Sequence, residues 1–366
     1  MRTSRREFLT TAAAGVGLSF AAPLVSAQQK RVRTIAGTGK PGYDAAITDA
    51  LQTPVTNPYG TVIGPDGALY FCEVDTGYVR RLDLASRRLT TIAGNGQKGY
   101  VGDGGPASAA SFTAPHEIRF DRDRHLYVVE RDAHVVRRID ARTNVVSTLA
   151  GTGVAGFSGD GGPAAQAQFR MPHSIAFDAA GNLLVCDIGN SRVRSIDLKT
   201  GTIATFAGTG ERRATPDQGP IEGAPLNGPR SMDTDPEGNI YLVLREGNAV
   251  FRIDARTRQL QRIAGTGATG FTGDGGPALA ATFNGPKGIA YGADGSLYIV
   301  DTENHVIRRV DLKSGVIATV IGTGERGDGP DGDPLQCKMI RPHGVCLDRG
   351  VLYVTDSENH RIRALS

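Results

Sequence analysis

The sequence is poor in several features that mark common protein classes. It contains no tryptophan, it shows no long helical periodicity, and its formal net charge is only +3 over 366 residues. Without a helical period, a helix bundle or a coiled coil is excluded as the main architecture. A charge so close to neutral gives no basic excess for a nucleic acid or an acidic membrane, so we expect neither as a partner.

Cysteine is also scarce. The four cysteines form no CxxC pair, which argues against a zinc knuckle or a redox motif. Cys72 and Cys186 lie in apolar runs and are expected in the core. Cys337 and Cys346 are close enough in sequence to form a disulfide bond, although a protein that folds before export does so in a reducing compartment. Bridged and free thiols both stay open at this point.

The first 27 residues have the composition of a targeting segment rather than of a folded domain. Residues 4–9 carry the paired arginines of a twin-arginine signal, residues 12–22 are apolar, and Val25-Ser26-Ala27 offers small residues for cleavage. The resemblance implies export of the folded protein, so we expect a periplasmic or secreted location with no membrane span after signal removal. The alternative is an uncleaved N-terminal anchor.

Glycine, in contrast, is abundant, and the 49 glycines indicate many tight turns. The tetrad Ala-Gly-Thr-Gly, or a close variant of it, begins at residues 36, 93, 150, 207, 264 and 321, each 57 residues after the last. A second marker has the same period: Pro58, Pro115, Pro172, Pro229 and Pro286, with Pro342 one residue short. Two markers in one register predict six copies of one structural unit.

Each unit contains four short runs rich in Val, Ile, Tyr and Thr, separated by Gly-containing turns. Four antiparallel strands repeated around a ring are typical of a propeller, so we expect an all-β, six-bladed β-propeller over residues 31–366. The sixth unit supplies only three strands after Pro342, while residues 31–37 form a fourth strand without the other three. The N-terminal strand is therefore expected to complete the last four-stranded blade and to close the ring.

The pattern Gly-Asn-Leu-Tyr-Val-x-Asp-x-x-Asn-x-x-Ile-Arg resembles the NHL repeat, and it runs through nearly all of the chain after the leader. The linker Gly-Asp-Gly-Gly-Pro-Ala at 102–107, 159–164 and 273–278 resembles a common variety of that repeat, whereas the fourth and sixth units depart from it. Some NHL domains bind RNA through a basic face. The near-neutral charge and the export signal argue against RNA here.

Features repeated in most units are expected to be scaffold. An aspartate ends the second strand and an arginine follows seven residues later, as in Asp187 and Arg194, which predicts a pair within the blade. The fourth unit replaces both partners together, with Leu244 and Phe251, which avoids leaving one buried charge alone. The aspartate of the Gly-Asp-Gly-Gly-Pro linker is expected to cap the short helical segment 163–167, because the loop lacks the alternating carboxylates of a calcium site.

Function is expected where equivalent positions diverge. The residue after each proline begins the innermost strand and faces the central channel. Around the ring these residues are Tyr59, His116, His173, Arg230, Lys287 and His343. Three of the seven histidines of the chain fall on this one position, which marks the ring as the candidate site.

Imidazoles that converge on one axis can bind zinc or another divalent metal. The Pro-His placement resembles the peptide-amidating lyase, a six-bladed NHL propeller whose zinc is held by histidines that follow prolines. The resemblance implies His116, His173 and His343 as metal ligands and Arg131 as an active-site arginine, with Arg245 at the same position in blade four.

This sequence departs from the lyase in two ways. Its histidines come from blades two, three and six rather than from alternating blades, and no tyrosine stands at the matching catalytic position. Tyr59 faces the channel and is the remaining candidate acid or base. Arg230 and Lys287 would repel a metal cation and attract an anion. The same ring therefore predicts a carboxylate, phosphate or sugar-acid site equally well, and a plain water-filled channel is the third alternative.

Calcium-dependent sugar-lactone hydrolases of the SMP-30 type resemble the chain less, because the six positions contain no carboxylate and only Glu117 is adjacent. We favour a monomeric binding module for a protein, a glycan or a small anionic ligand, since no complete catalytic set is present. The alternative function is a metal-dependent lyase or hydrolase at the propeller axis.

Overall fold

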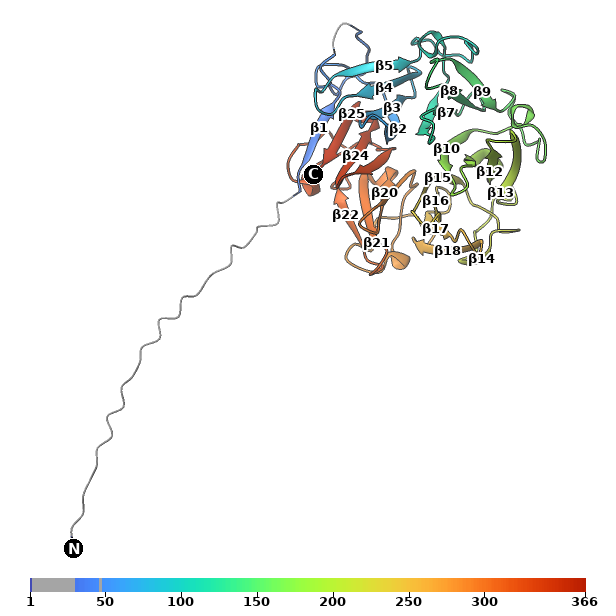
Figure 1. Cartoon of the computed structure of the whole chain (residues 1–366). Coiled ribbons are helices and arrows are strands. Elements are labelled where there is room, and N and C mark those ends of the chain that lie inside the picture. Colours follow the sequence, from blue (N-terminus) through green and yellow to red (C-terminus); the bar gives the residue numbers. More distant parts are fainter. Residues whose placement is uncertain (2–29, 46–47) are drawn as a thin grey trace.

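In the computed structural model, which describes residue 1, residues 30–45 and residues 48–366, six antiparallel sheets form a ring (Figure 1). The predicted all-β six-bladed propeller is confirmed. Apart from Met1, the predicted signal at residues 1–27 lies outside the described residues. Within the described part of the chain, no helix has the length and hydropathy needed to cross a bilayer.

In blades one, two, three and five the strands follow chain order from the axis outward, and the inner strands of neighbouring blades lie side by side around the ring. Blade one contains β2 (Pro58–Ile63), β3 (Leu69–Glu73), β4 (Tyr78–Leu82) and β5 (Leu89–Ala93). Blade two contains β6 (Pro115–Phe120), β7 (Leu126–Glu130), β8 (Val135–Ile139) and β9 (Val146–Ala150). Blade three contains β10 (Pro172–Phe177), β11 (Leu183–Asp187), β12 (Arg192–Asp197) and β13 (Thr202–Ala207). Blade five contains β19 (Gly288–Gly292), β20 (Ser296–Asp301), β21 (Val306–Asp311) and β22 (Ile317–Ile321).

The sixth blade joins the two ends of the described ring, as predicted. Its strands are β23 (Val345–Asp348), β24 (Val351–Asp356), β25 (Arg361–Leu365) and β1 (Val32–Ala36). In Figure 1 the blue strand β1 lies beside the red strand β25, and the register pairs Val32 with Leu365. Arg31 and Ser366 exchange two backbone hydrogen bonds, of 2.8 and 3.1 Å. The closure of the ring therefore rests on a full β-ladder.

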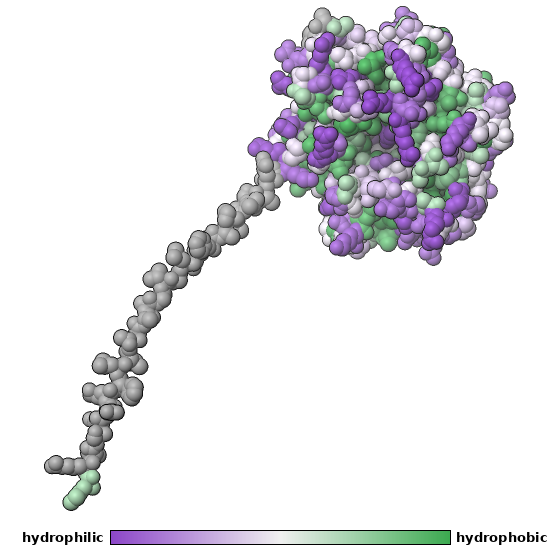
Figure 2. Space-filling view, in the orientation of Figure 1, coloured by the Kyte–Doolittle hydropathy of each residue, from purple (hydrophilic) through white to green (hydrophobic). Residues whose placement is uncertain are grey.

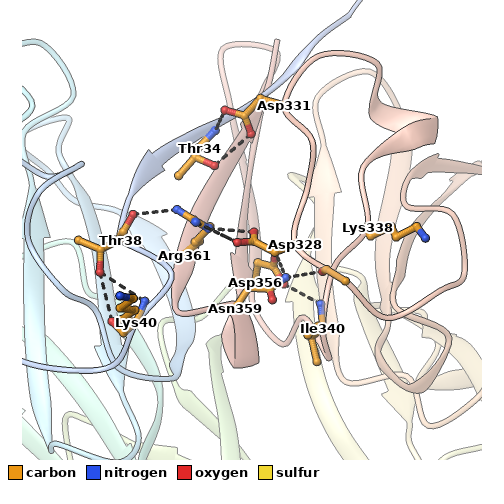
Figure 3. Close-up of polar contacts among 12 residues, drawn as sticks. Thr34, Thr38, Lys40, Asp328, Asp331, Lys338, Ile340, Asp356, Asn359 and Arg361 are labelled. Carbon is orange, nitrogen blue, oxygen red and sulfur yellow. Dashed lines mark hydrogen bonds and ion pairs between the residues drawn. The ribbon is translucent and has the colours of Figure 1, made fainter.

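Polar side chains reinforce this closing seam (Figure 3). The backbone N–H and the hydroxyl of Thr34 both donate to the carboxylate of Asp331, at 2.8 and 3.0 Å. Arg361 forms an ion pair with Asp328 at 2.9 Å and donates to the carbonyl of Gly37. The linker before the last blade is thus tied to both the first and the last strand of the propeller.

The fourth blade departs from the four-stranded prediction. Its strands β15 (Pro229–Thr234), β16 (Ile240–Leu244), β17 (Ala249–Ile253) and β18 (Gln259–Ala264) carry a fifth, outermost strand, β14 (Gln218–Pro220). In blades two, three and five the linker proline makes one isolated bridge to the outer strand, as Pro163 does with Thr202. Unit four lacks the Gly-Asp-Gly-Gly-Pro turn, so its linker runs straight and pairs over three residues.

The predicted helix cap by the linker aspartate is wrong. The described chain has seven short 3-10 helices: η1 (Ala107–Ala109), η2 (Ala164–Gln166), η3 (Ile188–Asn190), η4 (Ala278–Ala280), η5 (Thr302–Asn304), η6 (Pro334–Gln336) and η7 (Ser357–Asn359). No side chain caps η2; Asp160 instead forms an ion pair of 2.5 Å with Arg194 and accepts from the Thr205 hydroxyl. A buried arginine offers this carboxylate a stronger partner than the end of a three-residue helix.

The predicted acid–arginine pair is present in every blade except the fourth. Arg194 and Asp187 are fully buried and lie 3.8 Å apart, and the equivalent pairs in blades five and six measure 3.7 and 2.7 Å. In blades one and two the acid is a glutamate, Glu73 and Glu130. Leu244 and Phe251 fill the equivalent positions of blade four as buried apolar residues. The pair therefore belongs to the scaffold and not to a ligand site.

Apolar side chains fill the spaces between the blades. Cys72 and Cys186 are buried there, as expected, and all four cysteines are free thiols, so the structure contains no bridge between Cys337 and Cys346. Figure 2 shows hydrophilic residues spread over this face of the ring, with hydrophobic residues visible between them. These apolar residues hold neighbouring blades together, and the inner strand of each blade faces the axis.

Candidate functional site

The residue before each proline turns the chain into the inner strand. All six of these residues have a positive φ: Asn57 (47°), Ala114 (50°), Met171 (50°), Gly228 (74°), Gly285 (54°) and Arg341 (44°). Four of the six are not glycine, although L side chains rarely adopt this left-handed region. The turn places a main-chain carbonyl close to the side chain two residues later. Those side chains are the predicted site residues.

The structure brings the predicted site residues together. One cavity of about 430 Å³ on the propeller axis is lined by all six residues that follow the prolines and also by Arg131 and Arg245. Arg212, Arg341, Met171 and Ile188 complete much of its wall. The placement of these side chains follows the sequence prediction; the chemical role of each stays a prediction.

Hydrogen bonds at Nδ1 define the tautomers of the three histidines. Nδ1 of His116 lies 2.8 Å from the carbonyl of Ala114, and Nδ1 of His173 lies 2.7 Å from the carbonyl of Met171. A carbonyl can only accept, so each Nδ1 carries the proton and each Nε2 carries the lone pair.

The third histidine follows the same rule by a different route. Nδ1 of His343 lies 3.0 Å from the Ser357 hydroxyl, which itself donates to the carbonyl of Pro58 at 2.6 Å. The hydroxyl proton is thereby used, so Nδ1 donates to the hydroxyl oxygen and Nε2 is again the acceptor.

Aromatic contacts link these rings around one side of the cavity. The ring of Tyr59 stacks on His343 with centroids 3.8 Å apart, and it meets the edge of His116 at 4.8 Å. His116 in turn contacts His173 edge to face at 4.8 Å. Burial raises the pKa of Tyr59, so the phenol keeps its proton at neutral pH. These four rings form one packed wall from blades six, one, two and three.

Cationic side chains form the opposite side. Lys287 is 5% exposed and donates to the carboxylate of Glu303 at 2.8 Å. Its ammonium nitrogen also lies 3.3 Å from Nε2 of His343. Arg341 bonds Glu303 and Glu358 at 2.8 to 2.9 Å. Arg230 is also only 5% exposed, yet it has no hydrogen bond and no ion pair with any residue that the structure describes. None of the Arg230 nitrogens is among the fully enclosed unpartnered atoms, so the guanidinium opens on the cavity, where an anion could meet it, and Arg230 is the strongest sign of a ligand.

The charges of the cavity shift the pKa of the groups that line it. Burial, and next the charge of Arg230, lowers the pKa of His116 and of His173 well below the usual 6.5. Burial and Lys287 do the same for His343. Burial lowers the pKa of Lys287 to about 8 and that of Arg230 to about 10. At neutral pH the histidines are therefore uncharged, and the positive charge belongs to the arginines and to Lys287.

The histidines do not fit a metal ion as they are arranged. Among residues 30–45 and 48–366, no three His, Cys, Asp or Glu side chains lie together in a way that could hold one. Arg131 approaches Nε2 of His116 at 3.4 Å and Lys287 approaches Nε2 of His343, so cationic groups stand where a cation would bind. The arrangement suits an anion better than a metal.

Sequence reasoning missed several groups around the cavity. Arg341 precedes Pro342, where the other blades carry Asn, Ala, Met or Gly, and that difference is a signal that could have identified it.

A second repeated position was also missed. His134, His305 and His360 each accept, through Nδ1, the backbone N–H of the left-handed residue in the next blade, at 3.1 to 3.2 Å. These three histidines support the inner turns and do not line the cavity.

The six-bladed ring with a cavity on its axis defines the class as a β-propeller. Comparison with known families adds that residues 169–194 and 339–365 match the NHL repeat and that residues 267–348 match the teneurin NHL domain. Human NHL repeat-containing protein 2 is 24% identical over 319 residues, which cover 77% of this chain and 44% of that protein. The chain spans less than half of the curated relatives that it matches. These matches support the assignment of the chain to the NHL-repeat propellers.

Solved structures agree on the fold. An auxiliary nutrient binding protein from Bacteroides thetaiotaomicron superposes with a TM-score of 0.67 at 16% identity, over 92% of this chain and 76% of that one. Virginiamycin B lyase from Staphylococcus aureus gives a TM-score of 0.53 at 14% identity, over 92% and 99%. Binding proteins and enzymes thus share this architecture, and the choice between them must come from the cavity.

Proposed function

We propose that this chain is an exported propeller that binds a small anionic molecule in its axial cavity. The observation that carries the proposal is Arg230, a buried guanidinium that faces the cavity without a partner among the described residues. Lys287 stands in the next blade, and the uncharged histidines opposite add no negative charge. An anionic group on Arg230 would supply the missing charge-assisted hydrogen bonds.

Calorimetric titration of the purified chain tests the proposal with malate, gluconate, glucose 6-phosphate and neutral glucose as probes. We expect one or more of the anions to bind, glucose not to bind, and Arg230→Met to weaken binding by about ten-fold or more, because hydrogen bonds to a charged group contribute roughly 1.5–3 kcal/mol. Arg256→Met is the matched control, since Arg256 is exposed at an outer turn of the same blade. The proposal fails if no anion binds or if Arg230→Met binds as the wild type does.

Export is the second part of the proposal, and it rests on the paired Arg5 and Arg6 of the leader. The bacterial origin of the nutrient binding protein that shares the fold is compatible with it. Replacing both arginines with lysine in the full chain should leave the protein in the cytoplasmic fraction of a host with the twin-arginine route, whereas the unaltered chain should reach the periplasm. Equal distribution of the two proteins would contradict the signal.

A metal-dependent lyase or hydrolase is the second candidate function. One observation favours it: each histidine holds its Nδ1 proton on a protein oxygen and presents Nε2 to the cavity, which is how metal-binding imidazoles are usually oriented. Metal analysis of the purified protein separates the candidates. Stoichiometric zinc that disappears in His116→Ala/His173→Ala would support the enzyme, and a metal-free protein whose stability a chelator does not change would argue against it.

A further inference from the structure

Several groups that line the cavity lack a partner among the described residues, Ser191 Oγ and Arg245 Nε included, and two others stand on adjacent inner strands. Arg230 begins β15 and His173 begins β10, and these two inner strands lie side by side. Nε2 of His116 and Nε2 of His343 each receive a cationic donor. Nε2 of His173 has no hydrogen bond within the described chain, because the only bond of that ring is made by Nδ1. One free donor group and one free acceptor therefore face the same space.

The unpartnered acceptor limits what the ligand can be. The carbonyl of Met171 holds the proton of His173 at Nδ1, so Nε2 can only accept a hydrogen bond while the ring is neutral. Burial and the charge of Arg230 lower the pKa of this histidine, which keeps it neutral at physiological pH. A ligand that carries only acceptor oxygens, such as a plain carboxylate, would satisfy Arg230 and leave His173 without a partner.

We infer that the ligand is a 2-hydroxy acid, whose carboxylate binds Arg230 and whose neighbouring hydroxyl donates to Nε2 of His173. This inference rests on the proposed anion-binding function and narrows its substrate class. The rest of the molecule has room in the cavity of about 430 Å³, where Met171 and Ile188 offer apolar surface beside His173. Donor and acceptor then meet complementary groups on a single ligand, which is how a polar site gains specificity.

Matched acids test the inference directly. Mandelate and phenylacetate share one skeleton and differ by the 2-hydroxyl, as do malate and succinate. Isothermal titration of the whole chain should show the hydroxy acid of each pair binding about five- to ten-fold more tightly, the effect of one hydrogen bond of about 1 kcal/mol. Equal affinity within both pairs would overturn the inference while leaving the anion site intact. Failure of all four acids while glucose 6-phosphate binds would overturn the inference and leave the anion site intact, whereas failure of every anion, phosphate ester included, would refute the proposed function.

Variants of His173 separate a direct contact from a structural effect. His173→Phe keeps a ring but removes the acceptor, so it should lose the preference for mandelate while binding phenylacetate within about two-fold of the wild type. His173→Gln offers an amide oxygen and should recover part of the preference. His125→Phe is the control, because His125 lies in the hairpin between β6 and β7 and does not line the cavity. A preference for mandelate that persists in His173→Phe would overturn the inference.

Proton uptake provides a second, independent readout. If His173 instead took up a proton from the buffer and donated it in a hydrogen bond to a plain carboxylate, the measured heat would depend on the ionisation enthalpy of the buffer. A neutral acceptor predicts the same heat for mandelate in phosphate and in Tris at pH 7. Uptake of about one proton per mandelate that disappears in His173→Phe would overturn the inference, because a protonated ring cannot accept from the hydroxyl.

Discussion

Removing Arg80 from the first blade should destabilise the propeller more than removing Arg80 and its partner together. Arg80 and Glu73 are 2% and 0% exposed and lie 3.0 Å apart. Blade four shows how the chain manages without such a pair, since Leu244 and Phe251 occupy the two equivalent positions. The informative variants are therefore Arg80→Met alone and the double change Glu73→Leu/Arg80→Phe, which copies blade four.

The expected magnitudes follow from the burial of the pair. Arg80→Met leaves a carboxylate buried without its counter-charge, which costs about 3–5 kcal/mol. The double variant removes both charges. Only two donors then lose their acceptor, the backbone N–H of Thr56 and the hydroxyl of Thr76, which both hydrogen-bond Glu73. The expected loss of stability is therefore about 1–2 kcal/mol. For a chain of this length about 4 kcal/mol lowers Tm by about 6 °C.

Scanning calorimetry of the wild type and both variants measures the difference. Burial raises the pKa of Glu73 to about 7, so at pH 5 the carboxyl takes up a proton and the penalty of Arg80→Met should shrink relative to pH 8. A double variant that melts below the single variant, or a penalty that does not change with pH, would refute the account of these residues as one buried charge pair.

Three further predictions concern closure, charge and packing. Deletion of residues 31–37 removes the ladder of β1 on β25 and should lower the Tm of the whole ring, and a truncated chain that melts like the intact one would contradict closure. Binding of an anion should weaken as the pH rises through about 8, because burial lowers the pKa of Lys287 to about 8 and the ammonium then loses its proton; Lys287→Arg should flatten this profile in calorimetric titrations between pH 6.5 and 9.5. Phe157→Ala should lower stability by about 1 kcal/mol in urea denaturation, because the ring covers the buried Arg194 at 4.9 Å, and Leu279→Ala is a control at a similarly exposed site.

The ring of six blades could be predicted because its signal was repeated. Two markers with a period of 57 define each blade, and the incomplete sixth unit requires the strand at residues 31–37. The fifth strand of blade four could not be found in this way, since Gln218-Gly219-Pro220 carries no strand pattern and forms only because it lies against β18. The aspartate of the linker was assigned to a helix cap, because the arginine that it binds lies 34 residues further along the chain.

The candidate site was predictable in position but not in chemistry. Each residue after a proline reaches the axis, so the repeated proline marker was enough to identify the ring of three histidines and two cations. The carbonyls of Ala114 and Met171 decide which nitrogen of His116 and His173 carries the proton, and each carbonyl is placed by a left-handed turn that has no clear signal in the sequence. Likewise, Lys287 finds Glu303 in its own blade whereas Arg230 finds no partner, and only the assembled ring distinguishes them.

The inner turns have a consequence for how such a protein can change. All six have left-handed backbone geometry, and four of them also donate a backbone N–H to a side chain of the neighbouring blade, as Met171 does to His134. Apart from the bonds of His116 and His173 to the turn carbonyls, the side chain that follows the proline takes little part in this support, so it can be exchanged while the strand around it stays in place. The axis therefore offers six positions that share one backbone geometry although their side chains contact one another, and substitutions there can alter the ligand while the propeller fold is kept.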